Sequence, residues 1–202
     1  MTGRRPEAID ALVEALRGLP SIGAVTAERL AYHLLAVSES EALGLSDAIR
    51  RVREEVRVCG ICSNLDAEDP CRVCADPARD RSRVLVVEGA RDLASFEAAG
   101  WRGVYHVLRG RLAPLEGVQS KDLTIVALLE RARGTCFDEI CLATNPDLEG
   151  EATATEIAGL LAKFQKPPRV TRIARGIPAG AGITQVQHTI LTDALSGRRD
   201  LQ

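Results

Sequence analysis

Four closely spaced cysteines limit the folds open to this 202-residue chain more than any other feature. The spacing C-x2-C-x8-C-x2-C is formed by Cys59, Cys62, Cys71 and Cys74. They stand in a stretch, 59–80, that is too polar to build a hydrophobic core of its own. Two such pairs bring four thiolates to one centre, which is the tetrahedral ligand set that suits zinc. We therefore expect one structural Zn²⁺ per chain, since four protein ligands leave no position for water.

Two other states of these cysteines are two disulfides or four unrelated thiols. Disulfides are rare in a reducing cytosol, and bound metal would supply the folding free energy that a polar segment lacks. Cys136 and Cys141 have no ligand spacing, so we expect them to be small buried hydrophobic residues.

The first quarter of the chain has the apolar period of helices. Ile9, Leu12, Val13 and Leu16 lie on one face of a helix expected over 7–17. After a turn at 18–23, the period predicts a second helix that ends near residue 35 and a third over 45–56.

Beyond the cysteines the pattern changes to short apolar runs that alternate with helices. Strands are expected at 83–88, 104–108, 139–143 and 169–173. Helices are expected at 93–99 and 151–164. Alternation of this kind predicts an α/β domain with a parallel sheet.

The turn after the first helix, Leu19-Pro20-Ser21-Ile22-Gly23, resembles a helix-hairpin-helix. In that motif backbone N–H groups and the N-terminus of the second helix bind a DNA phosphate without reading bases. The resemblance implies DNA contacts from Ile22, Gly23, Thr26 and Arg29. Ser21 and Val25 depart from the motif, where a glycine and a basic residue are usual. The alternative is a plain αα-hairpin that packs or oligomerises.

Acidic residues follow two of the expected strands. Glu88 ends the first strand, and Asn145, Asp147 and Glu149 follow a later one, so all four should meet at the carboxyl edge of the sheet. The pattern resembles the Toprim domain of topoisomerases, primases and related nucleases, with Asn145 in place of the first metal-binding aspartate. An amide oxygen brings no charge to a metal site, so magnesium binding is weakened. In the alternative interpretation, Glu149 and its neighbours only cap a helix.

The order of these motifs is similar to that of the RecR family of bacterial recombination mediators. Matching stretches include Cys71-Arg72-Val73-Cys74-Ala75-Asp76-Pro77, Tyr105-His106-Val107-Leu108, Ala143-Thr144-Asn145-Pro146 and Arg172-Ile173-Ala174-Arg175-Gly176-Ile177-Pro178. The resemblance implies a ring-like tetramer that embraces DNA, binds RecO and RecF, and helps to load RecA during recombinational repair of DNA damage. It also makes Glu88, Asn145, Asp147 and Glu149 a partner surface rather than a catalytic centre.

With this resemblance we predict four segments. They are a helical region over 1–57, a four-cysteine zinc finger over 58–80, a Toprim domain over 81–174 and an oligomerisation tail over 175–202. The tail departs from the family's acidic pattern at Thr184 and Gln187, which argues against a nucleotide- or metal-linked role there. The three histidines, His33, His106 and His188, lack paired ligand spacing and are expected to be structural or surface residues.

Charge is distributed unevenly along the chain. Net charge is −2, with 7 basic and 12 acidic residues over 84–160 but 7 and 2 over 161–202. No apolar run approaches the ~18 residues of a membrane span, so we expect a cytoplasmic protein. The resemblance to the RecR family implies a non-catalytic, DNA-binding role. The alternatives are a magnesium-dependent phosphoryl-transfer enzyme using Glu88, Asp147 and Glu149, and a zinc-stabilised adaptor that binds no DNA.

Overall fold

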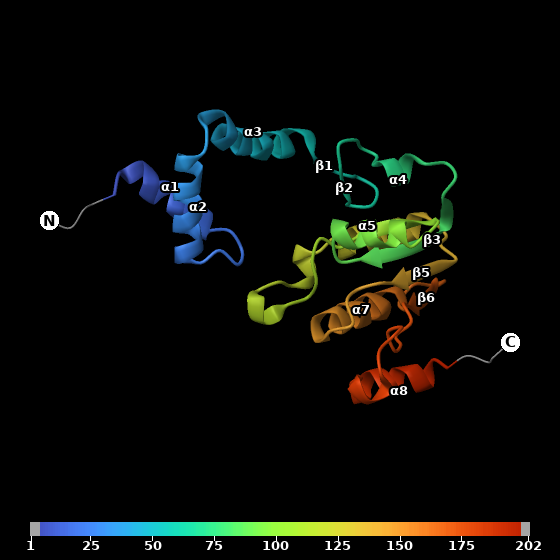
Figure 1. Ribbon diagram of the computed structural model, residues 1–202. Helices are drawn as coiled ribbons and strands as arrows, with labels where there is room; N and C mark the ends of the chain where they lie inside the picture. Colours follow the sequence, from blue (N-terminus) through green and yellow to red (C-terminus); the bar gives the residue numbers. More distant parts are fainter. Residues whose placement is uncertain (1–4, 199–202) are drawn as a thin grey trace. The chain divides into compact units, whose positions relative to one another are not determined.

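The computed structural model describes residues 5–198 and divides the chain into a helical unit, up to Val56, and a second unit from Arg57 onward (Figure 1). The helical unit contains α1 (Glu7–Arg17), α2 (Ala24–Ala36) and α3 (Glu39–Glu55). Its small core consists of Val13, Ala27 and Ala31, with Ile9, Leu12, Leu16 and Ile22 packed against it. The apolar face predicted for the first helix is therefore the packed face.

Helix α3 begins six residues before the predicted start. Ser38 is its N-cap, and its hydroxyl accepts a hydrogen bond from the Glu41 N–H at 3.3 Å, which satisfies one free donor of the first turn. The helix buries none of its residues, and its apolar stripe of Leu45, Ile49 and Val52 is exposed.

The second unit begins with the cysteine-rich segment. Two short antiparallel strands, β1 (Arg57–Val58) and β2 (Leu65–Asp66), flank the first cysteine pair, and α4 (Arg72–Ala75) includes the last cysteine. We call the segment from β1 to α4 the zinc knuckle.

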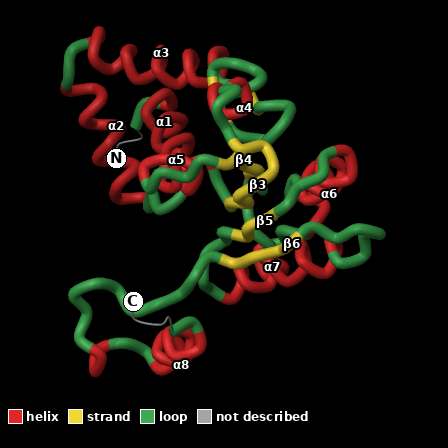
Figure 2. The backbone as a smooth tube through the Cα atoms, turned by 90° about the vertical axis from the view of Figure 1, so that its right-hand side faces the viewer, coloured by secondary structure: helices red, strands yellow, loops and turns green. Residues whose placement is uncertain are grey.

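A parallel sheet follows, as predicted. Its strands are β3 (Asp80–Val87), β4 (Gly103–Val107), β5 (Glu139–Leu142) and β6 (Arg169–Arg172), in the order β4-β3-β5-β6 (Figure 2). The helices that follow these strands are α5 (Ala90–Ala98), α6 (Ile125–Gly134) and α7 (Leu148–Leu161).

Both faces of the sheet are covered, which explains the unbroken apolar run in β3. Val84 and Val86 belong to one core cluster with residues of α6 and α7, whereas Leu85 and Val87 belong to another with Leu93 of α5. Because side chains alternate along a strand, a strand covered on both faces needs apolar residues at every position.

Besides the short α4 of the zinc knuckle, two helices of the described residues were not predicted. The start of α6, Ile125-Val126-Ala127-Leu128-Leu129, is a continuous apolar run without the period of a helix. The other is α8 (His188–Ser196), which follows the short 3-10 helix Ile183–Gln185. Thr184 and Gln187 are both exposed in this segment.

The prediction for the two remaining cysteines was wrong at Cys136, which is exposed, while Cys141 is half-buried. Cys136 lies in the connection between α6 and β5 rather than in either element, so no packed layer covers it.

His106 is a structural residue, completely buried in β4. Its Nε2 lies 3.0 Å from both the carbonyl and the hydroxyl oxygen of Thr124, and its Nδ1 has no partner among the described residues. Burial, with a smaller contribution from the positive charge of Arg131, lowers the pKa of His106 to about 4.

This histidine predicts a pH dependence of stability. Because the folded-state pKa lies below the unfolded value of about 6.5, the unfolded state binds more protons between these values. The free energy of unfolding should therefore fall by about 3 kcal/mol as the pH is lowered from 7 to 4. Urea unfolding of wild type and His106→Gln across this range measures it. The substitution should remove most of this component, and an unchanged slope would contradict the assignment.

Candidate functional site

The four cysteines of the zinc knuckle form a ready metal site. All are buried, and their sulfur atoms lie within 4.8 Å of one another. A tetrahedral zinc with Zn–S bonds of about 2.3 Å needs sulfurs about 3.8 Å apart. The Cys71 N–H also donates to the Cys59 sulfur at 3.4 Å, which would stabilise a thiolate ligand. The residues therefore fit a single Zn²⁺.

Hydrogen bonds join this knuckle to the edge strand β4 and to its neighbour β3. The Val107 N–H of β4 donates to the Cys62 carbonyl at 2.8 Å, and Arg81 of β3 donates to the Cys74 carbonyl at 3.0 Å. Val73 packs against the core cluster of the α5 face. The knuckle thus accepts a hydrogen bond from the Val107 N–H, which a bare edge strand would leave exposed.

The hairpin of the helical unit presents the N-terminus of α2. Gly23 is the N-cap, no side chain caps the helix, and its first turn contains no acidic residue. Thr26 and Arg29 are exposed and three residues apart, so they share a face, whereas Ile22 packs into the core beneath. Ser21 has the left-handed φ of 66° for which the motif's usual glycine is suited. The departure in sequence therefore leaves the hairpin conformation in place.

Glu88 and Asn145 form a closed pair at the carboxyl edge of the sheet. Glu88 follows β3 and is buried; Asn145 follows β5. The Asn145 backbone N–H donates to Glu88 Oε1 at 2.7 Å, and its side-chain Nδ2 donates to Glu88 Oε2 at 2.8 Å. Both carboxylate oxygens are thus satisfied without a cation, which an aspartate at position 145 could not achieve, since it has no side-chain donor.

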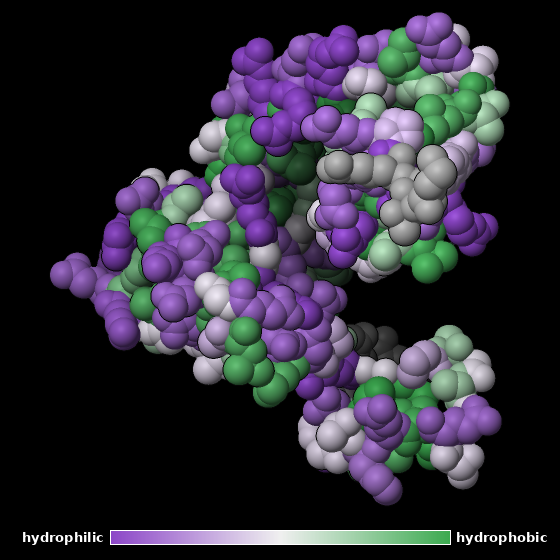
Figure 3. Space-filling view, turned by 90° about the vertical axis from the view of Figure 1, so that its left-hand side faces the viewer, coloured by the Kyte–Doolittle hydropathy of each residue, from purple (hydrophilic) through white to green (hydrophobic). Residues whose placement is uncertain are grey.

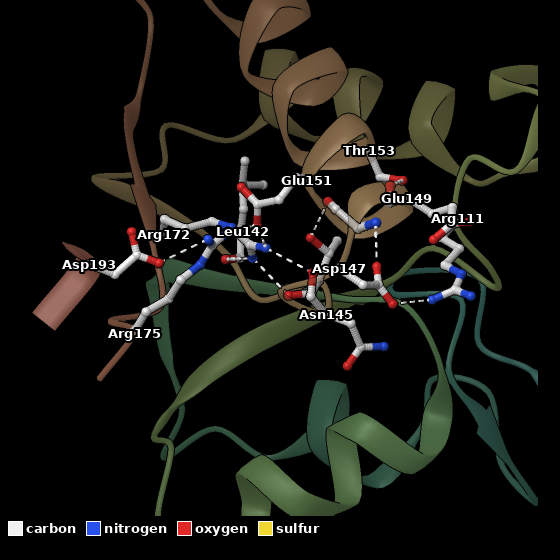
Figure 4. A network of polar contacts seen from close by, with 12 residues as sticks. Arg111, Leu142, Asn145, Asp147, Glu149, Glu151, Thr153, Arg172, Arg175 and Asp193 are labelled. Atoms are coloured by element: carbon white, nitrogen blue, oxygen red, sulfur yellow. Dashed lines mark hydrogen bonds and ion pairs between the residues drawn. The ribbon is translucent and has the colours of Figure 1, made fainter. Parts of the chain in front are cut away.

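Asp147 is engaged on both sides. Its Oδ1 caps α7 by accepting from the Gly150 N–H at 2.8 Å, and its Oδ2 pairs with Arg111 at 2.5 Å (Figure 4). Asp147 therefore does cap a helix, as the alternative interpretation supposed for its neighbours. Gly150 is needed here because a Cβ at that position would overlap the Asn145 carbonyl.

Two further arginines, Arg172 and Arg175, contact the loop after β5 and the start of α7. Arg172, at the end of β6, donates to the carbonyls of Leu142 and Thr144, both at 2.8 Å. Arg172 also forms an ion pair with Glu151 of α7. Arg175 pairs with the same carboxylate and, at 3.1 Å, with Asp193 of α8. These hydrogen bonds outweigh the effect of burial and hold the pKa of Glu151 below its usual value. In Figure 4 the Asn145 amide points away from this network.

The acidic residues at this edge do not converge on one point. Within residues 5–198, the cysteines are the one group of three or more potential ligands whose donor atoms lie close enough to share a metal. Glu88, Asp147 and Glu151 each already have a donor or cation as partner, and Glu149 is half-buried. In the described part of the chain, therefore, no three of these acids hold their oxygens close enough to share one cation.

The arginines of this site were not predicted from the sequence. Only acids were expected at strand ends, yet Arg109 and Arg111 follow β4 just as Glu88 follows β3. In a parallel sheet all such positions reach the same edge, so basic residues after strands were the available signal.

Comparison with known proteins agrees with this architecture. Three family models match: the RecR helix-hairpin-helix over residues 9–53, the RecR zinc finger domain with four cysteine ligands over 56–76, and the Toprim domain over 82–174.

Curated relatives that match nearly the whole chain are recombination proteins named RecR. The chain is 49% identical to the recombination protein RecR of Rhodopirellula baltica, over 96% of this chain and 97% of the relative. It is 44% identical to that of Acidobacterium capsulatum, over 98% and 99%, and 43% identical to that of Rubrobacter xylanophilus, over 96% of each. The chain belongs to the RecR family of recombination proteins.

Proposed function

We propose that this protein is a non-catalytic, DNA-binding mediator of recombinational repair. The observation that supports it most is the hairpin of the RecR-type helical unit, where the uncapped α2 N-terminus lies beside exposed Thr26 and Arg29. Free N–H groups, a partial positive charge and a nearby guanidinium suit a phosphate of the DNA backbone. Gly23 would allow close approach, and Ile22 would hold the hairpin against its core.

This proposal predicts a DNA affinity that falls steeply with salt. Each phosphate neutralised on duplex DNA adds about −0.9 to the slope of log K against log salt concentration. Arg29→Gln should weaken binding at low salt and make the slope shallower by about one for each subunit that contacts the DNA. Fluorescence anisotropy with a labelled duplex measures both quantities.

Arg53→Gln is the matched control, because Arg53 is also exposed in the helical unit and has no ion pair among the described residues. Equal losses in the two variants would contradict a role for the hairpin. Absence of binding at low salt, with zinc bound, would favour the adaptor that binds no DNA.

The paired Glu88 and Asn145 support the proposal that the protein is non-catalytic. A general acid or base must be free to exchange a proton, and a metal site needs unpaired carboxylates. We propose instead that exposed Asp147 and half-buried Glu149 form a surface that contacts RecO or RecF. Buried Glu88 would hold the neighbouring Asn145 in position through its two hydrogen bonds. DNA cleavage with Mg²⁺ or Mn²⁺ that Glu88→Gln abolishes would overturn this part.

We further propose a ring-like tetramer that encloses DNA and helps to load RecA, in the cytoplasm. The four segments of such a subunit would be the helical region 1–57, the zinc finger 58–80, the Toprim domain 81–174 and the tail 175–202, whose outermost residues lie outside the described part. No helix within residues 5–198 combines the length and apolar character of a membrane span.

Two exposed apolar surfaces support assembly. One is the α3 stripe of Leu45, Ile49 and Val52. The other surrounds α8, where Ile183 and Leu195 are exposed, and Figure 3 shows green apolar residues in this lower lobe.

Ile49→Glu should reduce the solution mass below that of the wild-type assembly, because a carboxylate cannot be buried unpaired in an apolar interface. Light scattering measures the mass. Arg53→Gln, on the same helix, should leave it unchanged; a monomeric wild type, or an Ile49→Glu variant of unchanged mass, would contradict this interface.

A further inference from the structure

A cavity of about 610 Å³ opens at the carboxyl edge of the sheet, beside the Glu88–Asn145 pair. Its walls come from the zinc knuckle, the start of α5 and the connection after β4. Arginines at positions 91, 109 and 111 line it, together with the apolar side chains of Leu65 and Val107. Its volume lies within the range of small-molecule sites, about 300–1,000 Å³.

The carboxylates of this cavity are already engaged, but two of its arginines are not. Glu88 accepts both hydrogen bonds of Asn145, and Asp92 accepts from the Gly89 N–H at 2.8 Å. Arg111 pairs with Asp147. Arg91 and Arg109 are exposed and have no side-chain hydrogen bond or ion pair within residues 5–198. The cavity therefore offers two guanidinium groups whose donors are free within residues 5–198, beside two carboxylates whose oxygens are occupied by neutral N–H donors.

The backbone adds to this charge. The nine-residue helix α5 begins at Ala90 on the cavity wall, so its N-terminal partial positive charge faces the same space. Arg109 has a φ of 63°, a left-handed conformation that costs about 1 kcal/mol in a residue other than glycine. The chain thus places this guanidinium at the cavity despite a conformational cost.

We propose that this cavity binds a phosphate group of nucleotide chemistry. Arg91 and Arg109 would donate to the phosphate oxygens, and Leu65 would contact the attached sugar. Asn145 is central, because an aspartate there would add a second negative charge beside Glu88 and repel the ligand. The site of a magnesium-dependent Toprim has in this chain become an anion site. This inference rests on the proposed function to the extent that a DNA strand supplies the phosphate.

Titration of the full-length protein with inorganic phosphate at low ionic strength tests the site. Nuclear magnetic resonance should show saturable shifts of the Ala90 and Gly110 amide signals. The double substitution Arg91→Gln with Arg109→Gln should raise the apparent Kd at least tenfold, and Arg91→Gln alone should raise it measurably if the double variant misfolds. Arg102→Gln, which removes an exposed arginine outside the cavity, is the matched control.

An unchanged Kd in the arginine variants, or shifts that do not saturate, would overturn the proposal. Thymidine monophosphate and a twelve-residue thymidine oligonucleotide then separate the sources of phosphate. Tighter binding of the oligonucleotide, lost in the double variant, assigns a DNA strand; equal binding of the two assigns a free nucleotide.

Hairpin variants keep this proposal separate from the proposed function. Arg29→Gln should leave the phosphate titration unchanged. If duplex DNA binds through the hairpin while phosphate does not enter the cavity, only the cavity proposal fails. If phosphate binds the cavity but the chain binds no DNA at any salt concentration, the proposed function fails instead.

Discussion

Cys62→Ser is expected to abolish stoichiometric zinc binding and to unfold the zinc knuckle. The only core of the knuckle, within the described residues, is formed by its four cysteines with the partly buried Val73 packed against them. Metal binding in structural zinc sites contributes about 10–16 kcal/mol, which becomes folding free energy where no other core exists. Loss of one thiolate removes much of that contribution.

The damage should remain local at first. The sheet has two clusters of its own, so the Toprim core is expected to persist while the knuckle and the outer edge of β4 lose protection. Hydrogen exchange should show fast exchange at Cys59 and Val107, whose N–H groups now donate to carbonyls of the knuckle. Zinc content should fall from one per chain to near zero.

Cys136→Ser is the matched control, because Cys136 is an exposed cysteine outside the knuckle. It should retain one zinc and wild-type exchange. A Cys62→Ser variant that keeps full zinc and protected amides would refute the four-thiolate site.

Asn145→Asp is expected to destabilise the protein by about 4 kcal/mol at pH 8, because two unit charges about 4 Å apart repel by that amount at an effective dielectric constant of 20. The variant replaces the Nδ2 donor, now 2.8 Å from Glu88, with a second carboxylate. The pair should take up a proton, so the folded-state pKa of one carboxyl rises and the deficit becomes smaller as the pH falls below that pKa.

The stability of the Asn145→Asp variant should depend on magnesium. With two facing carboxylates the variant offers the charge that wild type lacks, so millimolar Mg²⁺ should raise its melting temperature but leave that of wild type unchanged. Adding Glu88→Gln should restore most of the stability without Mg²⁺. A variant as stable as wild type in the absence of Mg²⁺, with zinc still bound, would contradict the role given to Asn145.

Local pattern was sufficient for much of the fold. The apolar period located α1 and α2, and the uninterrupted run Val84-Leu85-Val86-Val87 identified a strand covered on both faces. It failed at α6, where apolar residues on consecutive positions hide the helical period, and it placed the start of α3 six residues late, because the first turn carries no apolar stripe. Cys136 shows the same limit, since residue type alone cannot tell whether a connection is covered.

The sequence by itself determined the zinc ligands, the hairpin and the order of the segments, because each depends on spacings of a few residues. Only the tertiary structure decided what the Toprim residues do. Glu88 meets Asn145 across 57 positions and Arg111 meets Asp147 across 36, because the sheet order sets β3 between β4 and β5. That juxtaposition gives Glu88 and Asp147 hydrogen-bonding or ion-pair partners and leaves Arg91 and Arg109 without a side-chain partner in the described part of the chain.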